Sequence, residues 1–241
     1  MNFESVHLLN DLGNAVENGQ GERIKRISVS QQIQDSLRAR IVSLELAPGQ
    51  NLSRSDIATH YGVSQTPVRD AMMKLEEEGL LTIYPQSKTE VSKIDVEHAR
   101  ETQTLRLSLE LEVCRRLAKS GDPKAIDQAR KILHLQETAL SDGDLGLFSM
   151  LDKRFHLSLF QAVGIANLWQ LVASRSGHID RLRNLNLPDP GKAANILHYH
   201  RLILDAIESG NVQATDEAVR SHLSGTLETV DQIVARNPDY F

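Results

Sequence analysis

The sequence predicts a mainly α-helical protein in two parts: a small N-terminal part of short helices with a β-hairpin, and a larger all-α bundle. Three observations predict this division. Up to residue 94, short amphipathic segments end at glycines and precede two short strand-like runs. Beyond residue 95, long amphipathic segments are broken only by glycine, proline and a few polar residues. This second half has no strand pattern and no internal repeat, so an all-α architecture is expected there.

The composition is that of an ordinary globular protein. The 241 residues are 40% hydrophobic and 24% charged, which excludes disordered and fibrous classes. No apolar run approaches the roughly 20 residues that a membrane helix requires, and residues 1–21 lack the pattern of a secretory signal. Because Cys114 is the single cysteine, no internal disulfide can form. We therefore expect a cytoplasmic protein without membrane contacts.

Residues 1–27 are polar and glycine-containing, which predicts a flexible N-terminal arm. A helix is expected from Ser28 to Leu46, because apolar residues recur there every three or four positions. These apolar residues are Val29, Ile33, Leu37, Ile41 and Leu44. The helix is expected to end at Pro48-Gly49.

Two shorter helices follow. Ser53 is a suitable cap for a helix that runs to Tyr61, and Gly62 provides its left-handed end. The next helix begins almost immediately, with Ser64 as its cap, and runs to Glu78. The short turn between them favours a helix-turn-helix.

Two strand-like runs, 80–84 and 89–94, flank a turn at residues 85–88. Helix, helix, short turn, helix and hairpin is the order of elements in a winged helix-turn-helix. We therefore predict a DNA-binding domain at residues 28–94.

The second half, residues 95–241, is predicted to be an all-helical domain. Its amphipathic segments are separated by breaks at 121–123, 141–143, 164, 188–191 and 210. Six helices fit between these breaks, so a six-helix bundle is expected.

Polar side chains at the start of the second short helix are suited to reading base edges in a major groove. They are Ser64, Gln65, Thr66 and Arg69. Arg54 and Lys88 are candidates for phosphate contacts. The alternative is that Arg69, next to Asp70, simply solvates an exposed helix face.

Charge gives this DNA-binding prediction little support. Residues 28–94 hold seven Lys or Arg against eight Asp or Glu, a net charge of −1, which is low for a DNA-binding domain. The whole chain has a net charge of −5, so sequence-blind coating of nucleic acids is excluded. Arg23, Lys25 and Arg26 in the arm would add local positive charge.

An aspartate and three histidines form a candidate metal site. Asp152 and His156 share one helical stripe, and His200 and His222 lie on the inward stripes of two further segments. Together they would bind a divalent transition metal and leave two positions of an octahedral ion open. Taken alone, each histidine is better explained as a hydrogen-bonded core or surface residue, whereas a buried, unpaired aspartate is costly.

Segments of the first half resemble the signature of the GntR winged-helix family, which implies DNA binding. They are residues 47–53, 62–71 and 75–80. The family usually has arginine where Gln65 stands, often arginine at Ser55, and arginine-glycine where Ser87-Lys88 form the wing tip. Base contacts and the minor-groove role of the wing are therefore expected to differ, because glycine most easily takes positive φ in a tight turn.

Segments of the second half resemble the FadR-type ligand-binding domain called FCD. They are residues 104–110, 152–156, 167–168, 200–207 and 220–223. In metal-containing members the ligands fall at the positions of Asp152, His156, His200 and His222. The resemblance thus implies a bound divalent metal, with zinc or nickel favoured and manganese possible.

The same resemblance implies that a small carboxylic acid binds near the metal as the effector. Arg106 is the first candidate for its carboxylate partner, because a guanidinium binds carboxylates bidentately. Arg181 and Arg183 are weaker candidates. Arg106 is equally suited to an ion pair with Glu110, one turn away on its own helix.

We therefore predict a metabolite-responsive transcriptional regulator rather than an enzyme. Two chains would pair through residues 95–241, read a near-palindromic operator of double-stranded DNA near catabolic genes, and respond to a carboxylic or sugar-acid effector. Repressor and activator both remain open. One alternative is a metal-dependent hydrolase, but Glu110, Glu208 and Glu217 lack the spacing of a general base. The other alternative is a sensor of the metal ion itself. An acyl-CoA effector is disfavoured by the complete ligand set.

Overall fold

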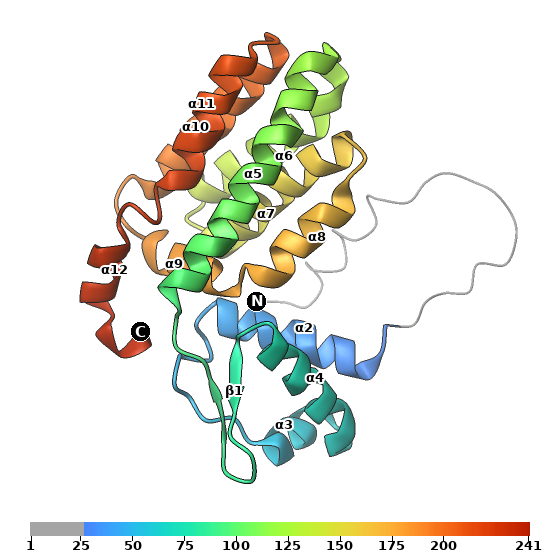
Figure 1. Ribbon diagram of the computed structural model, residues 1–241, viewed down its shortest axis with the longest axis vertical. Helices are drawn as coiled ribbons and strands as arrows, with labels where there is room; N and C mark the ends of the chain where they lie inside the picture. The colour runs from blue at the N-terminus through green and yellow to red at the C-terminus, as the bar shows by residue number, and fades with distance from the viewer. Residues whose placement is uncertain (1–26) are drawn as a thin grey trace, which may run out of the picture.

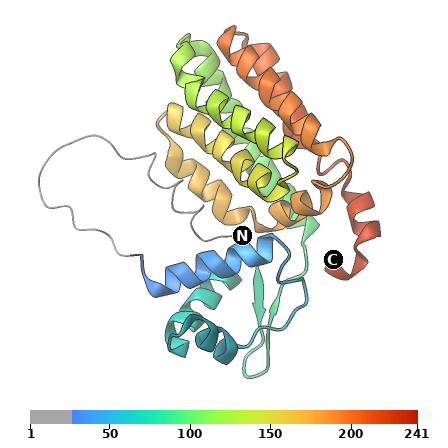
Figure 2. The ribbon, with the colours of Figure 1, turned by 180° about the vertical axis from the view of Figure 1, so that it is seen from behind.

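The structure, a computed structural model, describes residues 27–241, so the predicted arm lies outside the described residues except for Ile27. The chain forms two parts (Figure 1): α2, α3, α4 and a two-stranded sheet at one end, and the helices from α5 to α12 in a bundle beside them. The view from behind shows α2 lying across the base of this bundle (Figure 2). The predicted fold class is confirmed.

The first described helix, α2 (Val29–Val42), is shorter than its apolar pattern predicts. It ends at Val42 instead of continuing to Leu46, because Leu44 adopts a positive φ of 66° that no right-handed helix can contain. Leu46 lies in the non-helical segment after α2, and its side chain is still buried. Three of the predicted inward residues are fully buried: Ile33, Leu37 and Ile41.

The helix-turn-helix consists of α3 (Arg54–Tyr61) and α4 (Gln65–Glu77). As predicted, Ser53 caps α3 by accepting a hydrogen bond from a first-turn amide at 3.3 Å, and Gly62 ends it with a φ of 64°. Ser64 occupies the predicted cap position of α4, but its side chain makes no capping hydrogen bond. Its exposed hydroxyl is therefore available to another partner.

The hairpin consists of β1 (Leu81–Ile83) and β2 (Thr89–Val91), paired antiparallel over their full length. At its tip Gln86 takes a φ of 57°, the left-handed conformation that glycine adopts most easily, at a cost of roughly 1–2 kcal/mol. On one edge, Lys88 forms an ion pair with Glu90.

The second part contains eight α-helices among the described residues, because two of the six predicted segments are divided. One divides at Ser176 and the other at residues 225–229. The helices are α5 (Val96–Ser120), α6 (Asp127–Ser141), α7 (Leu145–Ala162), α8 (Ala166–Arg175), α9 (Gly177–Asn186), α10 (Lys192–Glu208), α11 (Val212–Ser224) and α12 (Val230–Arg236). Short 3₁₀ turns, η2 (Pro123–Ile126) and η3 (Pro238–Tyr240), follow α5 and α12.

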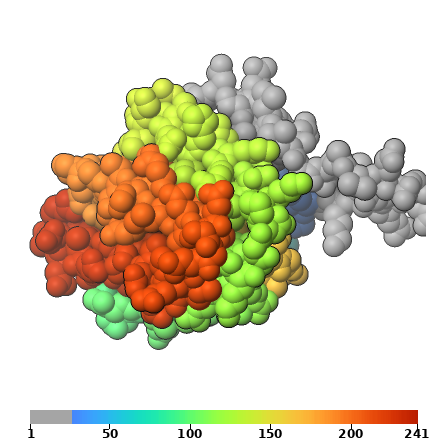
Figure 3. All heavy atoms as spheres, turned by 90° about the horizontal axis from the view of Figure 1, so that it is seen from above, coloured from blue at the N-terminus to red at the C-terminus, as the bar shows by residue number. Residues whose placement is uncertain are grey.

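The bundle core lies between α5, α6, α7, α10 and α11 and is rich in aromatic residues. Phe148, Phe155 and Phe160 of α7 are fully buried, and Trp169 of α8 packs against Phe160. From above, α10 and α11 lie side by side next to α5 and α6 (Figure 3). Among the described helices, none is both long enough and apolar enough to cross a membrane.

Several polar contacts connect the two parts, and four of them are well-defined hydrogen bonds of 2.5–2.8 Å. Arg38 of α2 donates to the carbonyl of Ala173 at 2.5 Å, and Asn184 of α9 donates to the carbonyl of Val42 at 2.6 Å. The others are Arg181 to the carbonyl of Ser92 at 2.6 Å and the amide of Ile94 to the carbonyl of Tyr240 at 2.8 Å. These contacts fix the orientation of the winged helix on the bundle.

Candidate metal centre and DNA-reading face

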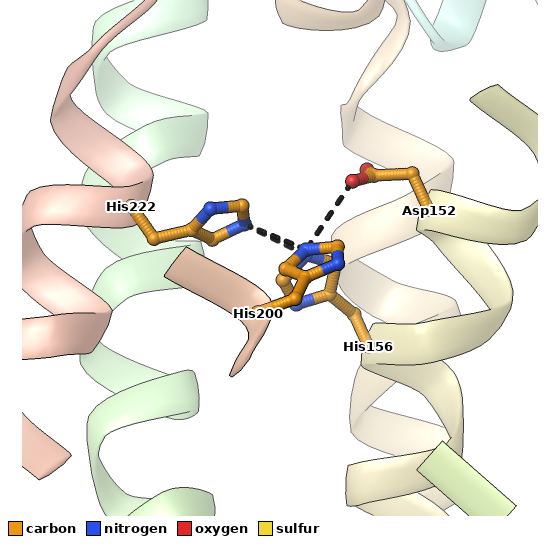
Figure 4. A group of neighbouring side chains, drawn as sticks. All are labelled: Asp152, His156, His200 and His222. Carbon is orange, nitrogen blue, oxygen red and sulfur yellow. Dashed lines mark hydrogen bonds and ion pairs between the residues drawn. The ribbon is translucent and has the colours of Figure 1, made fainter. Parts of the chain in front are cut away.

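The structure brings the four predicted ligands together in the bundle. Asp152 and His156 lie one turn apart on α7, while His200 comes from α10 and His222 from α11 (Figure 4). One ligand atom from each residue lies within 4.8 Å of the other three. His156 and His200 are fully buried, so the cluster lies inside the bundle rather than on its surface.

The Nε2 atoms of the three histidines converge. His222 Nε2 lies 3.1 Å from His156 Nε2 and 3.2 Å from His200 Nε2, and His200 Nε2 lies 3.5 Å from a carboxylate oxygen of Asp152. Two nitrogens bound at about 2.1 Å to one ion lie about 3.0 Å apart at an octahedral right angle and about 3.4 Å apart at a tetrahedral angle. The spacing therefore fits a single metal ion.

Residues behind the histidines orient these rings. His156 Nδ1 lies 2.7 Å from a carboxylate oxygen of Glu110, and His200 Nδ1 lies 2.9 Å from the amide oxygen of Gln136. Both partners are acceptors, so each Nδ1 carries the proton and each neutral ring has a lone pair on Nε2. The sequence suggested Glu110 only as a partner of Arg106, and it contained no signal for Gln136.

This arrangement leaves lone pairs facing one another. His156 and His200 both direct an Nε2 lone pair at the Nε2 of His222, which has at most one proton to donate to them. The Nδ1 of His222 is buried and has no hydrogen-bond partner within residues 27–241. A divalent cation in the centre would satisfy all three Nε2 atoms, so the donor set fits a metal better than it fits a purely hydrogen-bonded cluster.

The protonation states suit metal ligands. Burial lowers the pKa of His200 to about 3, and burial also lowers the pKa of His222. For Asp152, burial raises the pKa, but the charged groups around it, which include Arg183 and Arg106, outweigh burial and the net pKa is lowered. Neutral imidazoles and an ionised carboxylate are the forms that bind metals.

Arg106 is buried beside this centre and is already engaged. Its Nε donates to Glu110, as the structural alternative predicted, and its guanidinium lies 5.5 Å from the centroid of the Trp169 ring. Its Nη2 is buried without a partner among the described residues. Arg106 therefore helps to hold Glu110, and through it His156, in place.

A cavity opens on one side of the centre, with Asp152 and His222 in its wall. Three basic side chains line it: Lys153, Arg183 and Lys192. It also has polar groups for hydroxyl or carboxylate contacts, from Ser149, Asn184 and Thr226. Arg183 thus lies where an effector contact was predicted, whereas Arg106 is not part of the wall.

The cavity has more positive than negative charge outside the four ligands. Asp180 is its single acidic residue there and pairs with Lys153 at 2.8 Å and Arg183 at 3.7 Å. Lys192 has no acidic partner within 4.0 Å among the described residues. Anionic ligands are therefore favoured in this cavity.

Arg181 lies elsewhere. Its side chain is fully buried at the junction of the two parts and is held by carbonyl oxygens rather than by a carboxylate. Arg181 does not line the cavity, so nothing in this arrangement supports an effector contact for it. Helical periodicity could not predict this position of the Arg181 side chain. Arg181 lies on α9 (Gly177–Asn186) and bonds to Ser92, in the segment that joins the wing to α5.

The predicted DNA contacts are all exposed. Those at the start of α4 are Ser64, Gln65, Thr66 and Arg69, all exposed. Arg69 lies 3.6 Å from Asp70, with 60% of its side chain exposed. Arg54, at the start of α3, and Lys88, in the wing, are also exposed, and both line one pocket between α3 and the wing. The ion pair with Glu90 offsets the positive charge of Lys88 and so reduces its attraction for a phosphate.

Both parts match known families. Residues 29–91 match the model of bacterial regulatory proteins of the gntR family, and residues 101–225 match the model of the FCD domain. The two matches correspond to the winged helix and to the bundle from α5 to α11.

Relatives of similar length carry regulator names. The chain is 36% identical to an uncharacterized HTH-type transcriptional regulator from an unstable DNA locus of Streptomyces ambofaciens, over 85% of this chain and 86% of the relative. It is 32% identical to the HTH-type transcriptional repressor RspR of Escherichia coli (strain K12), over 88% and 93%. The solved structure of E. coli McbR/YncC shares the fold, with a TM-score of 0.72 and 18% identity over 86% and 99%. These matches indicate a regulator rather than an enzyme, which removes the hydrolase alternative.

Proposed function

The chain belongs to the GntR family of bacterial regulatory proteins and carries an FCD domain, and from this premise we propose how this DNA-binding transcriptional regulator responds to a metabolite. We assign it to the FadR subfamily, with residues 28–94 binding DNA and residues 95–241 binding the effector and forming a homodimer. It controls catabolic genes and works in the cytoplasm, where its operator is. The arm at residues 1–27 remains a prediction.

The observation that carries the proposal is the convergence of three Nε2 atoms and a carboxylate in the bundle interior. Asp152, His156, His200 and His222 hold one divalent metal ion, with Glu110 and Gln136 fixing two of the rings. Zinc or nickel suits these nitrogen and oxygen ligands, and manganese suits them less well. When bound, the ion supplies a Lewis-acid position for an effector oxygen.

The effector is a small carboxylic or sugar acid that lies in the cavity beside the four ligands. Arg183 and Lys192 bind its negative charge, and Ser149 and Asn184 offer hydrogen bonds to hydroxyl groups. A sensor of the metal ion alone would not require a cation-rich cavity beside the ligands, so an organic effector is favoured over that alternative.

At the operator, α4, the second helix of the helix-turn-helix, is the recognition helix. The two copies of α4 in the dimer enter successive major grooves of near-palindromic DNA. Gln65, Thr66 and Arg69 read bases. The hydroxyl of Ser64, which makes no capping hydrogen bond to α4, adds a further contact to the DNA. Arg54 and Lys88 contact phosphates. Effector binding changes the placement of the winged helices and therefore the affinity for DNA.

Metal content tests the site directly. We would measure it by mass spectrometry on purified wild type, His200→Ala, His222→Ala and the control His134→Ala, whose side chain is 81% exposed. We expect about one ion per chain in wild type and the control, and its loss in both site variants. Equal metal content in all four proteins, or no metal in wild type after incubation with zinc or nickel, would refute the site and leave the winged helix unaffected.

A further inference from the structure

Asn184 of α9 belongs to two sites at once. Its side chain lines the cavity beside the metal ligands, and its amide nitrogen donates to the carbonyl of Val42 in the winged helix at 2.6 Å. Its amide oxygen accepts a long hydrogen bond of 3.5 Å from Ser149, which also lines the cavity. One amide group therefore connects the cavity wall to the DNA-binding part.

The contact from Asn184 lies at the C-terminal end of α2 in the winged helix. Val42 is the last residue of α2, and carbonyls in the last turn of a helix lack an intrahelical donor. The chain then turns sharply through Leu44 at a positive φ. The donor from Asn184 therefore stabilises a helix end whose own backbone cannot satisfy it.

Movement of this helix end would reach the recognition helix. The helices α2 and α4 pack against each other, and Gln34 and Lys74 make hydrogen bonds between α2 and the α4 region. By contrast, Arg38 and Arg181, which also connect the two parts, do not line the cavity beside the metal ligands. Of these three contacts, the one through Asn184 is the one that a ligand in that cavity can reach.

We propose that Asn184 couples ligand binding to the placement of the winged helix: a ligand oxygen that accepts from the Asn184 amide draws it away from Val42. The inference rests on the proposed effector site and adds the residue through which that site acts. The long bond from Ser149 holds the amide weakly at its oxygen end, so reorientation requires the loss of one strong contact. One such hydrogen bond corresponds to a roughly 2- to 10-fold effect, within reach of known allosteric couplings.

Hydrogen exchange of the full-length, zinc-loaded protein tests this role. The amides of Ser43, Leu44 and Leu46 bond to carbonyls of the last turn of α2, so their exchange rates report opening of this helix end. We would compare wild type, Asn184→Ala and Asn186→Ala, each with and without millimolar D-gluconate as a sugar-acid probe. Asn186 is the matched control, because its amide on the same helix bonds to Asp189 within the bundle.

Without gluconate, Asn184→Ala should accelerate exchange of these amides by roughly 2- to 10-fold, while Asn186→Ala should leave it at the wild-type rate. Gluconate should move wild type toward the Asn184→Ala rate and add nothing to that variant. Unchanged exchange in ligand-free Asn184→Ala, or an equal gluconate response in wild type and Asn184→Ala, would overturn the coupling. If gluconate protects no residue of the cavity, this member of the proposed effector class fails, while the ligand-free comparison still decides whether Asn184 holds α2.

Discussion

Arg181 donates from Nη1 to the carbonyl of Ser92 at 2.6 Å and thereby joins α9 to the linker that follows the wing. Its Nη2 is 2.9 Å from His178 Nδ1, and its Nε bonds to the carbonyl of Gly177. The guanidinium is fully buried and makes no ion pair with a carboxylate of the described residues. A buried cation satisfied by carbonyls and an imidazole is a rigid connection, because each bond lost leaves a buried polar group unsatisfied.

We expect Arg181→Met to lower the free energy of unfolding by roughly 2–4 kcal/mol. Methionine fills much of the same volume but leaves the Ser92 carbonyl without its donor. Urea denaturation measures the loss. Arg116→Met is the control, because Arg116 forms an exposed pair with Glu112, and such pairs contribute at most about 1 kcal/mol. Equal stabilities of the two variants would contradict a structural role for Arg181.

His178 makes stability depend on pH. Burial and the charge of the neighbouring Arg181 lower its pKa to about 4. Its Nδ1 also accepts hydrogen bonds from Arg181 and from the amide of Asp95. The folded state therefore favours the neutral ring. Its contribution is fully present above the unfolded pKa of about 6.5 and is lost as the pH falls toward 4, by up to about 3 kcal/mol.

Because other histidines also titrate, the test is a difference between variants. We expect the stability advantage of wild type over His178→Gln to shrink between pH 7.5 and pH 4.5 in urea denaturation. His134→Gln, the same substitution at an exposed position of α6, is the control measured alongside. A wild-type advantage over His178→Gln that does not change with pH would show that His178 is not kept neutral.

Gly177 allows α9 to approach the wing closely. A Cβ atom at this position would lie 2.5 Å from a side-chain carbon of Leu80, which is fully buried. Gly177→Ala should therefore destabilise the protein by roughly 1–3 kcal/mol. Gly146→Ala, within α7, should be neutral or stabilising by up to about 1 kcal/mol, because its Cβ would meet only a carboxylate oxygen of Asp144, at 3.4 Å. Thermal unfolding of both variants distinguishes these outcomes.

Arg69→Ala should weaken operator binding by roughly 1–3 kcal/mol and relax sequence preference at one base pair. Lys88→Ala should have a smaller effect, equal on all sequences, because Lys88 is paired with Glu90. Fluorescence anisotropy with operator fragments selected from random DNA measures both effects. Lys131→Ala, an exposed substitution on α6, is the control. If Arg69→Ala binds like this control, Arg69 only solvates the helix face.

The sequence by itself determined the order of helices and the residue types of the candidate site. Glycines such as Gly62 and Gly79 end helices where a positive φ is needed, and the spacing of Asp152 and His156 places both on one face of a helix. These are local properties, because caps, breakers and helical periodicity act within a few residues.

Only the tertiary structure decided which residues meet across helices. In the folded chain, His200 and His222 lie next to Asp152 and His156 of α7, and Gln136 bonds to His200. Arg181 bonds to Ser92 instead of lining the cavity. Asn184 bonds to Val42 of the winged helix. Helical periodicity gives the face on which a side chain lies but not the neighbour that packs against it. That choice depends on crossing angles and on contacts between residues far apart in the chain, such as Asn184 and Val42.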